Sequence, residues 1–314
     1  MALATGLLVR LPNYVGDAVC ALPALQALAT RGALLALGPS WAVPLLAAAG
    51  LAARPYPRGL RARVGVLRAT AQDAGTRRIL LLTHSFSSAL EARLAGLAPI
   101  GFAKDGRRLL LARSAGRLPG GHLVEDYAHL ARVADAPVDV SMAAWTPTWP
   151  GPRADNVRID AAHARAQAAL GDARPYALLV PRAGGGHGGA TKDWPSMARL
   201  MPVLRAAGLR VVMAPGPGEA AAFAAAAPGA ETLGGLDLVA LGVLAAKARV
   251  VIAPDCGPGH LAAAAGARGV AIFGPTDPAR SRPWSPRVEV LGGGGAWPTE
   301  SDVHAAIARL LASP

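Results

Sequence analysis

Cysteine, lysine and aromatic residues are scarce in this sequence, and their shortage excludes several classes of protein. The 314 residues include two cysteines, Cys20 and Cys256, which lie too far apart for a metal-binding motif and are expected to be reduced thiols of a cytosolic protein. Aromatic residues make up 4% of the chain, and no run of five basic residues occurs. Because nucleic-acid surfaces combine basic clusters with stacking aromatics, no nucleic-acid partner is expected.

The sequence also lacks the marks of a secreted or membrane-spanning protein. No basic stretch precedes an apolar segment at the N-terminus, so a signal peptide is not expected. Residues 32–53 carry no charge over a length that could cross a bilayer, but Gly38, Pro39 and Pro44 divide them into a short strand and the start of a helix. We therefore expect a soluble, globular chain.

Apolar residues and positive charge are what the chain has in excess. Hydrophobic residues make up 52% of the sequence, and 314 residues suffice for two domains with separate cores. Arginine supplies nearly all of the basic side chains, and the formal net charge is +12. This charge favours anionic partners such as phosphate groups or an acidic membrane surface; arginines that only keep the surface solvated are the alternative.

Short apolar runs alternate with alanine-rich helical stretches along the whole chain. The predicted strands cover residues 6–10, 33–37, 79–83, 176–181, 209–214, 249–253 and 269–273. The predicted helices cover residues 17–31, 40–50, 86–96, 122–135, 194–207, 218–226, 236–247 and 258–266. This alternation predicts the α/β class, with parallel sheets covered by helices on both faces. Residues 137–157, rich in Pro and Trp, are the predicted linker, so we expect two Rossmann-like, doubly wound domains, residues 1–152 and 153–314.

Three strand-to-helix turns combine glycine with side chains that can carry chemistry, and ligands of such sheets bind at this edge. In the first turn, "RLPNYVGDAV", Asn13 and Gly16 are expected to bend the chain before Asp17. Asp17 either stabilises the start of the following helix, as a cap or through the helix dipole, or lies in a cleft as a general base. The residues alone leave both alternatives open.

The second turn, "PRAGGGHGGATKDWP", contains Lys192, whose ammonium group could neutralise a phosphate. The turn matches neither a P-loop nor a dinucleotide-binding fingerprint. Asp193 is the expected cap of the next helix, and the role of His187 stays open.

The third turn, "PDCGPGHLAAAAGA", begins the helix at 258–266. Its amide N–H groups and the positive end of the helix dipole form a potential anion site, and Gly257 and Gly259 allow a ligand to approach closely. Asp255 either caps this helix or contacts the ligand, whereas Cys256 is expected to be a small residue in a tight place.

Together these turns resemble the ADP-heptose–lipopolysaccharide heptosyltransferases of glycosyltransferase family 9, which are inverting enzymes of the GT-B fold. The resemblance rests on four segments in the family's order: "LVRLPNYVGDAVCALPALQAL", "HLVEDYAHLA", "PRAGGGHGGATKDWP" and "PDCGPGHLAAAAGARGVAIFGPTDP". It is closest to heptosyltransferase II, which adds the second inner-core heptose. It implies an acceptor-binding N-terminal domain and a nucleotide-sugar-binding C-terminal domain that face a central cleft.

The resemblance also implies roles for residues at matching positions. Asp17 would be the catalytic base, Lys192 would contact the diphosphate, and Asp255 would hold the donor heptose. The further donor-side positions are Cys256, Gly257, Gly259 and His260, and the possible acceptor-side positions are Asn13, Gly16 and His122. A second reading of His122 is that it starts a helix. Family members usually carry Ser or Thr where Cys256 stands and Trp where Tyr14 stands, so contacts of these two side chains would differ here.

The function implied by the resemblance is transfer of heptose from ADP-heptose to the lipopolysaccharide inner core, without an obligatory cofactor or metal ion. The expected partners are ADP-heptose, the core acceptor and the anionic inner face of the cytoplasmic membrane. Arginines such as Arg58, Arg61, Arg63 and Arg68 would dock the N-terminal domain on that surface. Two alternatives stay open: a transferase of the same fold with another nucleotide-sugar or acceptor, and a non-catalytic nucleotide-sugar-binding protein.

Overall fold

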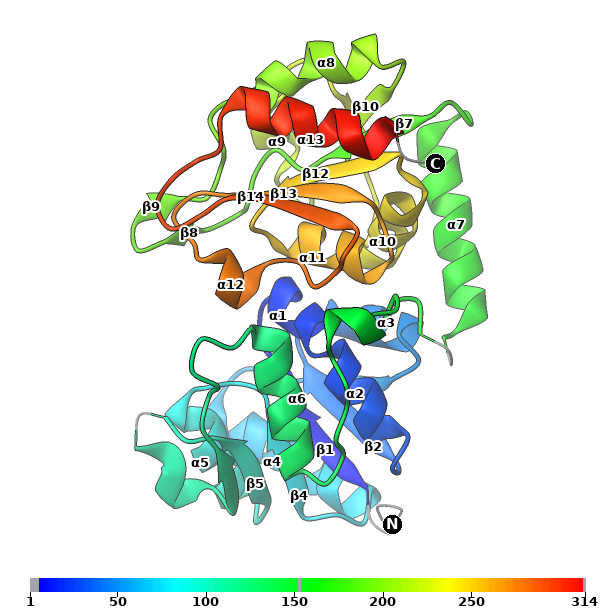
Figure 1. The fold of residues 1–314 in the computed structure, drawn as a ribbon. Coiled ribbons are helices and arrows are strands. Elements are labelled where there is room, and N and C mark those ends of the chain that lie inside the picture. Colours follow the sequence, from blue (N-terminus) through cyan, green and yellow to red (C-terminus); the bar gives the residue numbers. More distant parts are fainter. Residues whose placement is uncertain (1–5, 105, 152–153, 313–314) are drawn as a thin grey trace. The chain divides into compact units, whose positions relative to one another are not determined.

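The computed structural model describes residues 6–104, 106–151 and 154–312, which form two compact α/β units (Figure 1). The first unit runs to Ala144 and includes Gly151–Asp155, and the second comprises Trp145–Pro150 and the chain from Asn156 onward. The predicted domain boundary between residues 152 and 153 lies outside the described residues.

The first unit contains a six-stranded parallel sheet in the order β3-β2-β1-β4-β5-β6. Its strands are β1 (Leu7–Arg10), β2 (Leu34–Gly38), β3 (Ala52–Pro55), β4 (Arg78–Leu81), β5 (Ala98–Phe102) and β6 (Arg113–Ala115). Its helices are α1 (Val15–Cys20), α2 (Leu22–Ala29), α3 (Ala42–Ala48), α4 (Leu60–Asp73), α5 (Phe86–Leu94) and α6 (Leu123–Val133), with the short 3-10 helices η1 (Arg107–Leu110) and η2 (Met142–Ala144). Because all six strands are parallel, their carboxyl ends share one edge of the sheet.

The second unit repeats this arrangement with the strand order β11-β10-β7-β12-β13-β14. Its strands are β7 (Tyr176–Leu179), β10 (Arg210–Met213), β11 (Glu231–Thr232), β12 (Val250–Pro254), β13 (Gly269–Phe273) and β14 (Val288–Gly292), and a separate hairpin joins β8 (Gly186–His187) to β9 (Ala190–Thr191). Its helices are α7 (Asn156–Leu170), η3 (Met197–Arg199), α8 (Leu200–Ala206), α9 (Ala220–Ala226), α10 (Leu238–Lys247), α11 (Gly257–Ala264), α12 (Pro278–Ser281) and α13 (Glu300–Ala312).

Helices cover both faces of each sheet, so the central strands are buried apolar runs. In the first unit, Leu67 of α4 and Ala89 of α5 pack against Leu8 and Ile79 of the sheet, and α2 packs beside α6. In the second unit, α8, α9 and α13 lie on one face, whereas α10 and α11 lie on the other (Figure 1). Burial of these apolar faces is the main force that holds each layer in place.

All seven predicted strands are present, but two predicted helices are wrong in their extent. The helix expected over 17–31 is two helices, α1 and α2, because Pro23 has no N–H to continue the ladder and occupies the first turn of α2. The helix expected over 194–207 begins later, with η3 at Met197 and α8 at Leu200.

The described residues of the predicted linker, 137–151 and 154–157, have little regular structure, and Trp149 anchors them. The N–H groups of Thr148 and Trp149 donate to the carbonyl oxygen of Ala264 at 3.0 and 3.1 Å. The Trp149 ring is fully buried and lies against Gly242 of α10, where an added Cβ would approach the ring to 2.5 Å. Gly242 is therefore a packing requirement of the second unit.

Substitution of two glycines that both lie inside helices should shift stability in opposite directions. Gly242→Ala should destabilise the protein by about 1–3 kcal/mol, because the methyl group overlaps Trp149. Gly65→Ala in α4 is the matched control, since nothing lies within 4 Å of its added Cβ, and it should stabilise by about 0.5–1 kcal/mol through helix propensity. Denaturant unfolding measures both values, and equal effects of the two substitutions would contradict the packing argument.

Candidate functional site

The second unit gathers Asp255, Lys192 and His260 at the carboxyl edge of its sheet. Asp255 follows β12 directly, and its Oδ2 lies 3.4 Å from Nζ of Lys192. Its other oxygen, Oδ1, lies 3.9 Å from Nε2 of His260, which is on α11. Asp255 and His260 are both 7% exposed, so the structure brings together three predicted site residues from two separate turns.

Asp255 stays ionised in this buried position because its neighbours stabilise the negative charge. Burial raises the pKa of Asp255, but the neighbouring His260, the charge of Lys192 and, to a smaller extent, Thr276 outweigh burial, so the net pKa is lowered from 3.8. A carboxylate at neutral pH is thus available to accept hydrogen bonds from a ligand.

Helix α11 begins beside this carboxylate and directs its first amides towards the same edge. Cys256, not Asp255, is the N-cap residue, so Asp255 does not cap α11. Pro258 has no N–H, so the amides of the first turn belong to Gly257 and Gly259. Gly259 is buried, and its added Cβ would lie 3.3 Å from Cβ of Ala253, so this glycine lets α11 pack closely on β12.

The Cys256 side chain behaves as a small apolar group. It is buried, and burial raises the pKa of its thiol to about 12. It makes no capping hydrogen bond to α11. A hydroxyl at this position would offer a polar contact that the thiol does not supply.

Lys192 is positioned by the glycine-rich segment that precedes it. Gly188 and Gly189 form the β8–β9 turn, with φ angles of 56° and 83° that favour glycine. After Lys192, the Asp193 carboxylate accepts hydrogen bonds from the Ala183 N–H at 2.7 Å and from Nε of Arg182 at 3.0 Å. The prediction that Asp193 caps the next helix is wrong, because its carboxylate closes the loop back onto the end of β7.

In the first unit, Asp17 lies in the first turn of α1, half-buried. The N-cap residue is Tyr14, so Asp17 does not cap the helix, although its charge still lies at the positive end of the helix dipole. Burial and then the Asp17 charge raise the pKa of Tyr127, which lies buried on α6. The helices that carry Asp17 and Tyr127, α1 and α6, pack against each other.

A network of polar side chains holds the loop that leads to Asp17. The buried Arg10 guanidinium donates from Nη2 to Oδ1 of Asn13 at 2.9 Å and lies 4.5 Å above the ring of Tyr56. The Tyr56 hydroxyl donates to Glu91 at 2.9 Å, and Arg63 pairs with the same carboxylate at 2.9 Å. Asn13 is thereby linked to α4 and α5.

In the structure, Gly16 and His122 both belong to helix starts. Gly16 lies within α1 and not at a bend, since its φ is not positive. His122 is buried and starts α6: its Nδ1 accepts from the Val124 N–H at 3.1 Å, and Glu125 accepts from the His122 N–H at 2.6 Å. Of the two roles predicted for His122, the helix start is confirmed, and the acceptor-side role of both residues stays a prediction.

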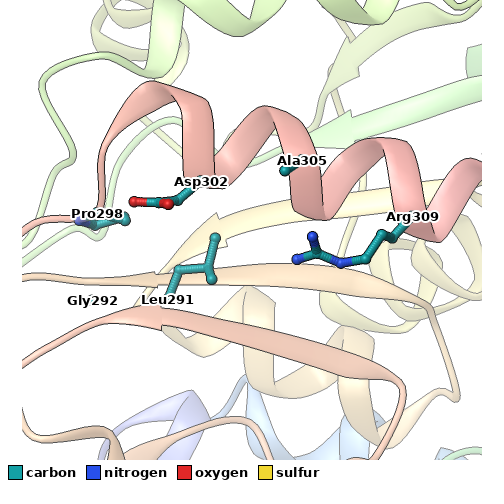
Figure 2. Close-up of a pocket in the computed structure, with 6 residues that line it drawn as sticks. All are labelled: Leu291, Gly292, Pro298, Asp302, Ala305 and Arg309. Atoms are coloured by element: carbon teal, nitrogen blue, oxygen red, sulfur yellow. The ribbon is translucent and has the colours of Figure 1, made fainter.

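A cavity of about 320 Å³ lies elsewhere in the second unit, between β14 and α13 (Figure 2). It is lined by Leu291, Gly292, Pro298, Asp302, Ala305 and Arg309. Its charged side chains are engaged within the protein, Asp302 with Thr299 and Arg309 with Glu289. No predicted site residue lines this cavity, so it does not define the functional site.

The described part of the chain contains no cluster of three or more His, Cys, Asp or Glu side chains that could hold a metal ion. It also contains no helix long and apolar enough to cross a membrane.

Comparisons with known proteins agree with this architecture. The family model of glycosyltransferase family 9 (heptosyltransferase) matches residues 67–306. The solved structure of ADP-heptose lps heptosyltransferase II from E. coli is similar over 98% of each chain, at 24% identity and a TM-score of 0.77.

Two further structures show the same fold. The glycosyltransferase family 9 protein of Veillonella parvula DSM 2008 is 15% identical over 99% of this chain and 98% of that one, with a TM-score of 0.74. Heptosyltransferase WaaC from E. coli, solved with ADP, is 21% identical over 97% of this chain and 99% of that one, with a TM-score of 0.69. No curated protein sequence matches the chain.

The two doubly wound units thus have the fold of the GT-B glycosyltransferases, and the predicted fold class is confirmed. Because the family model covers most of its length, the chain belongs to glycosyltransferase family 9 (heptosyltransferase) and is a glycosyltransferase.

Sequence patterns revealed neither the influence of Thr276 on Asp255 nor the surroundings of His84. Thr276 stands in the segment "FGPTDP" after β13, so its place at a strand end could be predicted, but its effect on the pKa of Asp255 could not. His84 follows β4 and stacks on Phe102, with ring centroids 5.1 Å apart. Burial and the charges of Arg117, Arg107 and Lys104 lower its pKa to about 4.

His84 should make the protein sensitive to acid. The unfolded chain binds a proton at His84 below about pH 6.5, whereas the folded protein does so only near pH 4, so stability should fall as the pH drops between these values. Its Nδ1 is buried without a hydrogen-bond partner among the described residues, which adds to the cost of charging the ring. His84→Phe keeps an aromatic ring on Phe102 and should flatten this decline, measured as melting temperature from pH 8 to pH 4. A variant with the wild-type pH profile would contradict the assignment.

Proposed function

We propose that the chain transfers L-glycero-D-manno-heptose from ADP-heptose to the inner core of lipopolysaccharide, with inversion at the anomeric carbon. The observation that carries the proposal is the buried, ionised Asp255 held by Lys192 and His260 at the start of α11. The fold is shared with E. coli heptosyltransferase structures solved with ADP and with ADP-2-deoxy-2-fluoro heptose. The C-terminal unit is the proposed donor domain and the N-terminal unit the proposed acceptor domain.

In the donor domain, three groups have complementary tasks. The Lys192 ammonium and the amides at the start of α11 face the diphosphate, and a helix N-terminus favours such an anion. The Asp255 carboxylate accepts hydrogen bonds from heptose hydroxyls, and His260 lies beside that carboxylate. When a diphosphate binds, the ammonium of Lys192 forms an ion pair with the ligand, and its interaction with Asp255 weakens.

In the proposed chemical step, the Asp17 carboxylate takes the proton of an acceptor hydroxyl. The hydroxyl oxygen forms a bond to the anomeric carbon from the face opposite ADP, and the bond from that carbon to the diphosphate oxygen breaks. The negative charge that develops on ADP is stabilised by Lys192 and the helix N-terminus. The step uses the Asp17 carboxylate as the base and needs no obligatory metal ion.

The proposed acceptor is a membrane glycolipid with anionic groups, and the proposed place of action is the inner face of the cytoplasmic membrane. The formal net charge of +12 supports association with an anionic surface.

Replacing the proposed base should abolish catalysis without weakening binding of the donor. Asp17→Asn should lower kcat by roughly 100-fold to 10,000-fold, the usual contribution of a general base, with little change in melting temperature or ADP affinity. Transfer from ADP-heptose to a heptose-deficient core acceptor, followed by mass spectrometry, measures it. Asp73→Asn is the matched control, because that carboxylate is exposed and pairs only with Arg54 among the described residues. Near-normal turnover by a folded Asp17→Asn protein would contradict the assignment.

Replacing the proposed phosphate-binding lysine should weaken binding of the nucleotide. Lys192→Met should raise the Kd for ADP roughly tenfold or more, since one charge-assisted contact is lost. Calorimetry with ADP measures the change, and Lys247→Met, at the end of α10, is the control with an unchanged Kd. An unaltered ADP affinity in Lys192→Met would contradict the proposed donor site. Tighter binding of a UDP-sugar than of ADP-heptose would show that the donor is not ADP-heptose.

A further inference from the structure

Large apolar side chains are exposed at the carboxyl edge of the first unit's sheet. Leu60, Phe86 and Leu109 follow strands β3, β4 and β5, and their exposed fractions are 50%, 49% and 89%. Exposed apolar side chains are ordinary when scattered, but a group on one edge marks an interaction surface. The described part of the second unit exposes a single comparable side chain, Val157.

Contacts between the three elements place the segments that carry these side chains next to one another. Helices α4 and α5 begin at this edge and pack together, and Arg63 of α4 pairs with Glu91 of α5 at 2.9 Å. The 3-10 helix η1 is fixed to the start of α5, because the buried Arg107 donates to the carbonyl oxygen of Ser85 at 3.1 Å. Leu109 lies on the same 3-10 helix, two residues after Arg107, and is exposed.

Basic side chains accompany the apolar ones. Arg58, Arg61, Lys104 and Arg108 are all exposed on the segments that carry Leu60 and Leu109. Within the described ranges, Arg58 and Arg61 form no ion pair.

Acidic residues do little to offset this charge. Between residues 54 and 118 the acids are Asp73, Glu91 and Asp105. Glu91 is already paired with Arg63, and Asp73 lies at the opposite end of α4. The segments around Leu60 and Leu109 therefore carry a net positive charge.

We propose that this surface, the docking edge, binds an anionic lipid bilayer. It is defined by Leu60, Phe86, Leu109, Arg58, Arg61 and Arg108. Separate apolar side chains can enter the boundary between headgroups and acyl chains without a shape-complementary partner, while arginines contact the anionic headgroups. The proposal deepens the proposed function, since it names the surface by which the enzyme would reach a membrane-embedded acceptor.

Vesicle binding tests the docking edge without any sugar substrate. The wild-type protein should co-sediment with phosphatidylglycerol vesicles and not with phosphatidylcholine vesicles, and binding should weaken as salt rises from about 0.1 M to about 0.5 M. Leu60→Ser, Phe86→Ser and Leu109→Ser should each weaken vesicle binding roughly fivefold to tenfold. Leu94→Ser is the matched control, because Leu94 is 48% exposed at the other end of the same helix as Phe86, and it should bind as the wild type does.

Transfer assays separate docking from catalysis. The triple serine variant should retain activity on a delipidated core acceptor in solution and lose it on acceptor embedded in vesicles. The proposal is overturned if the triple variant binds anionic vesicles normally, if Leu94→Ser is equally defective, or if the serine variants only dissociate a dimer in ultracentrifugation. A wild-type protein that binds vesicles but transfers no heptose contradicts the proposed function and still supports the docking edge.

Discussion

The ion pair between Lys192 and Asp255 is the interaction on which the candidate site of the second unit depends. A buried carboxylate is costly unless neighbouring groups compensate its charge, and here His260 and Lys192 do so, with an N–O distance of 3.4 Å to the lysine. The pair also connects the glycine-rich loop after β7 with the turn after β12. A ligand that carries both hydroxyls and phosphates can satisfy the carboxylate and the ammonium together.

The first unit has the same sheet geometry but a different proposed role. Its carboxyl edge carries Asp17 in the first turn of α1, and the preceding loop is held by Arg10 through Asn13 and through the ring of Tyr56. The loop is therefore fixed by groups from other helices and not by local turn residues alone. The same edge also carries the exposed apolar and basic residues around Leu109, which follows β5, two strands away from β1, so the proposed base and the proposed docking edge lie on one edge of one sheet.

The sequence predicted the parts of this architecture that depend on local pattern. Buried runs such as Leu7–Arg10 and Gly269–Phe273 were recognisable as strands, whereas the edge strands Ala52–Pro55 and Val288–Gly292 were missed because partial exposure removes the continuous apolar signal. The turns with Lys192 and Asp255 were found from glycine and charge. The hydrogen bond between Tyr56 and Glu91, 35 residues apart, depends on how the helices pack, so the spacing of residues along the sequence could not predict it.

The central claim is a single displacement in which a hydroxyl replaces ADP at the anomeric carbon. The most direct measurement is the anomeric configuration of the heptose in the product, determined by nuclear magnetic resonance after transfer from the β-linked donor. The account predicts an α-linked heptose. A β-linked product would require two displacements through a covalent intermediate and would contradict the role assigned to Asp17.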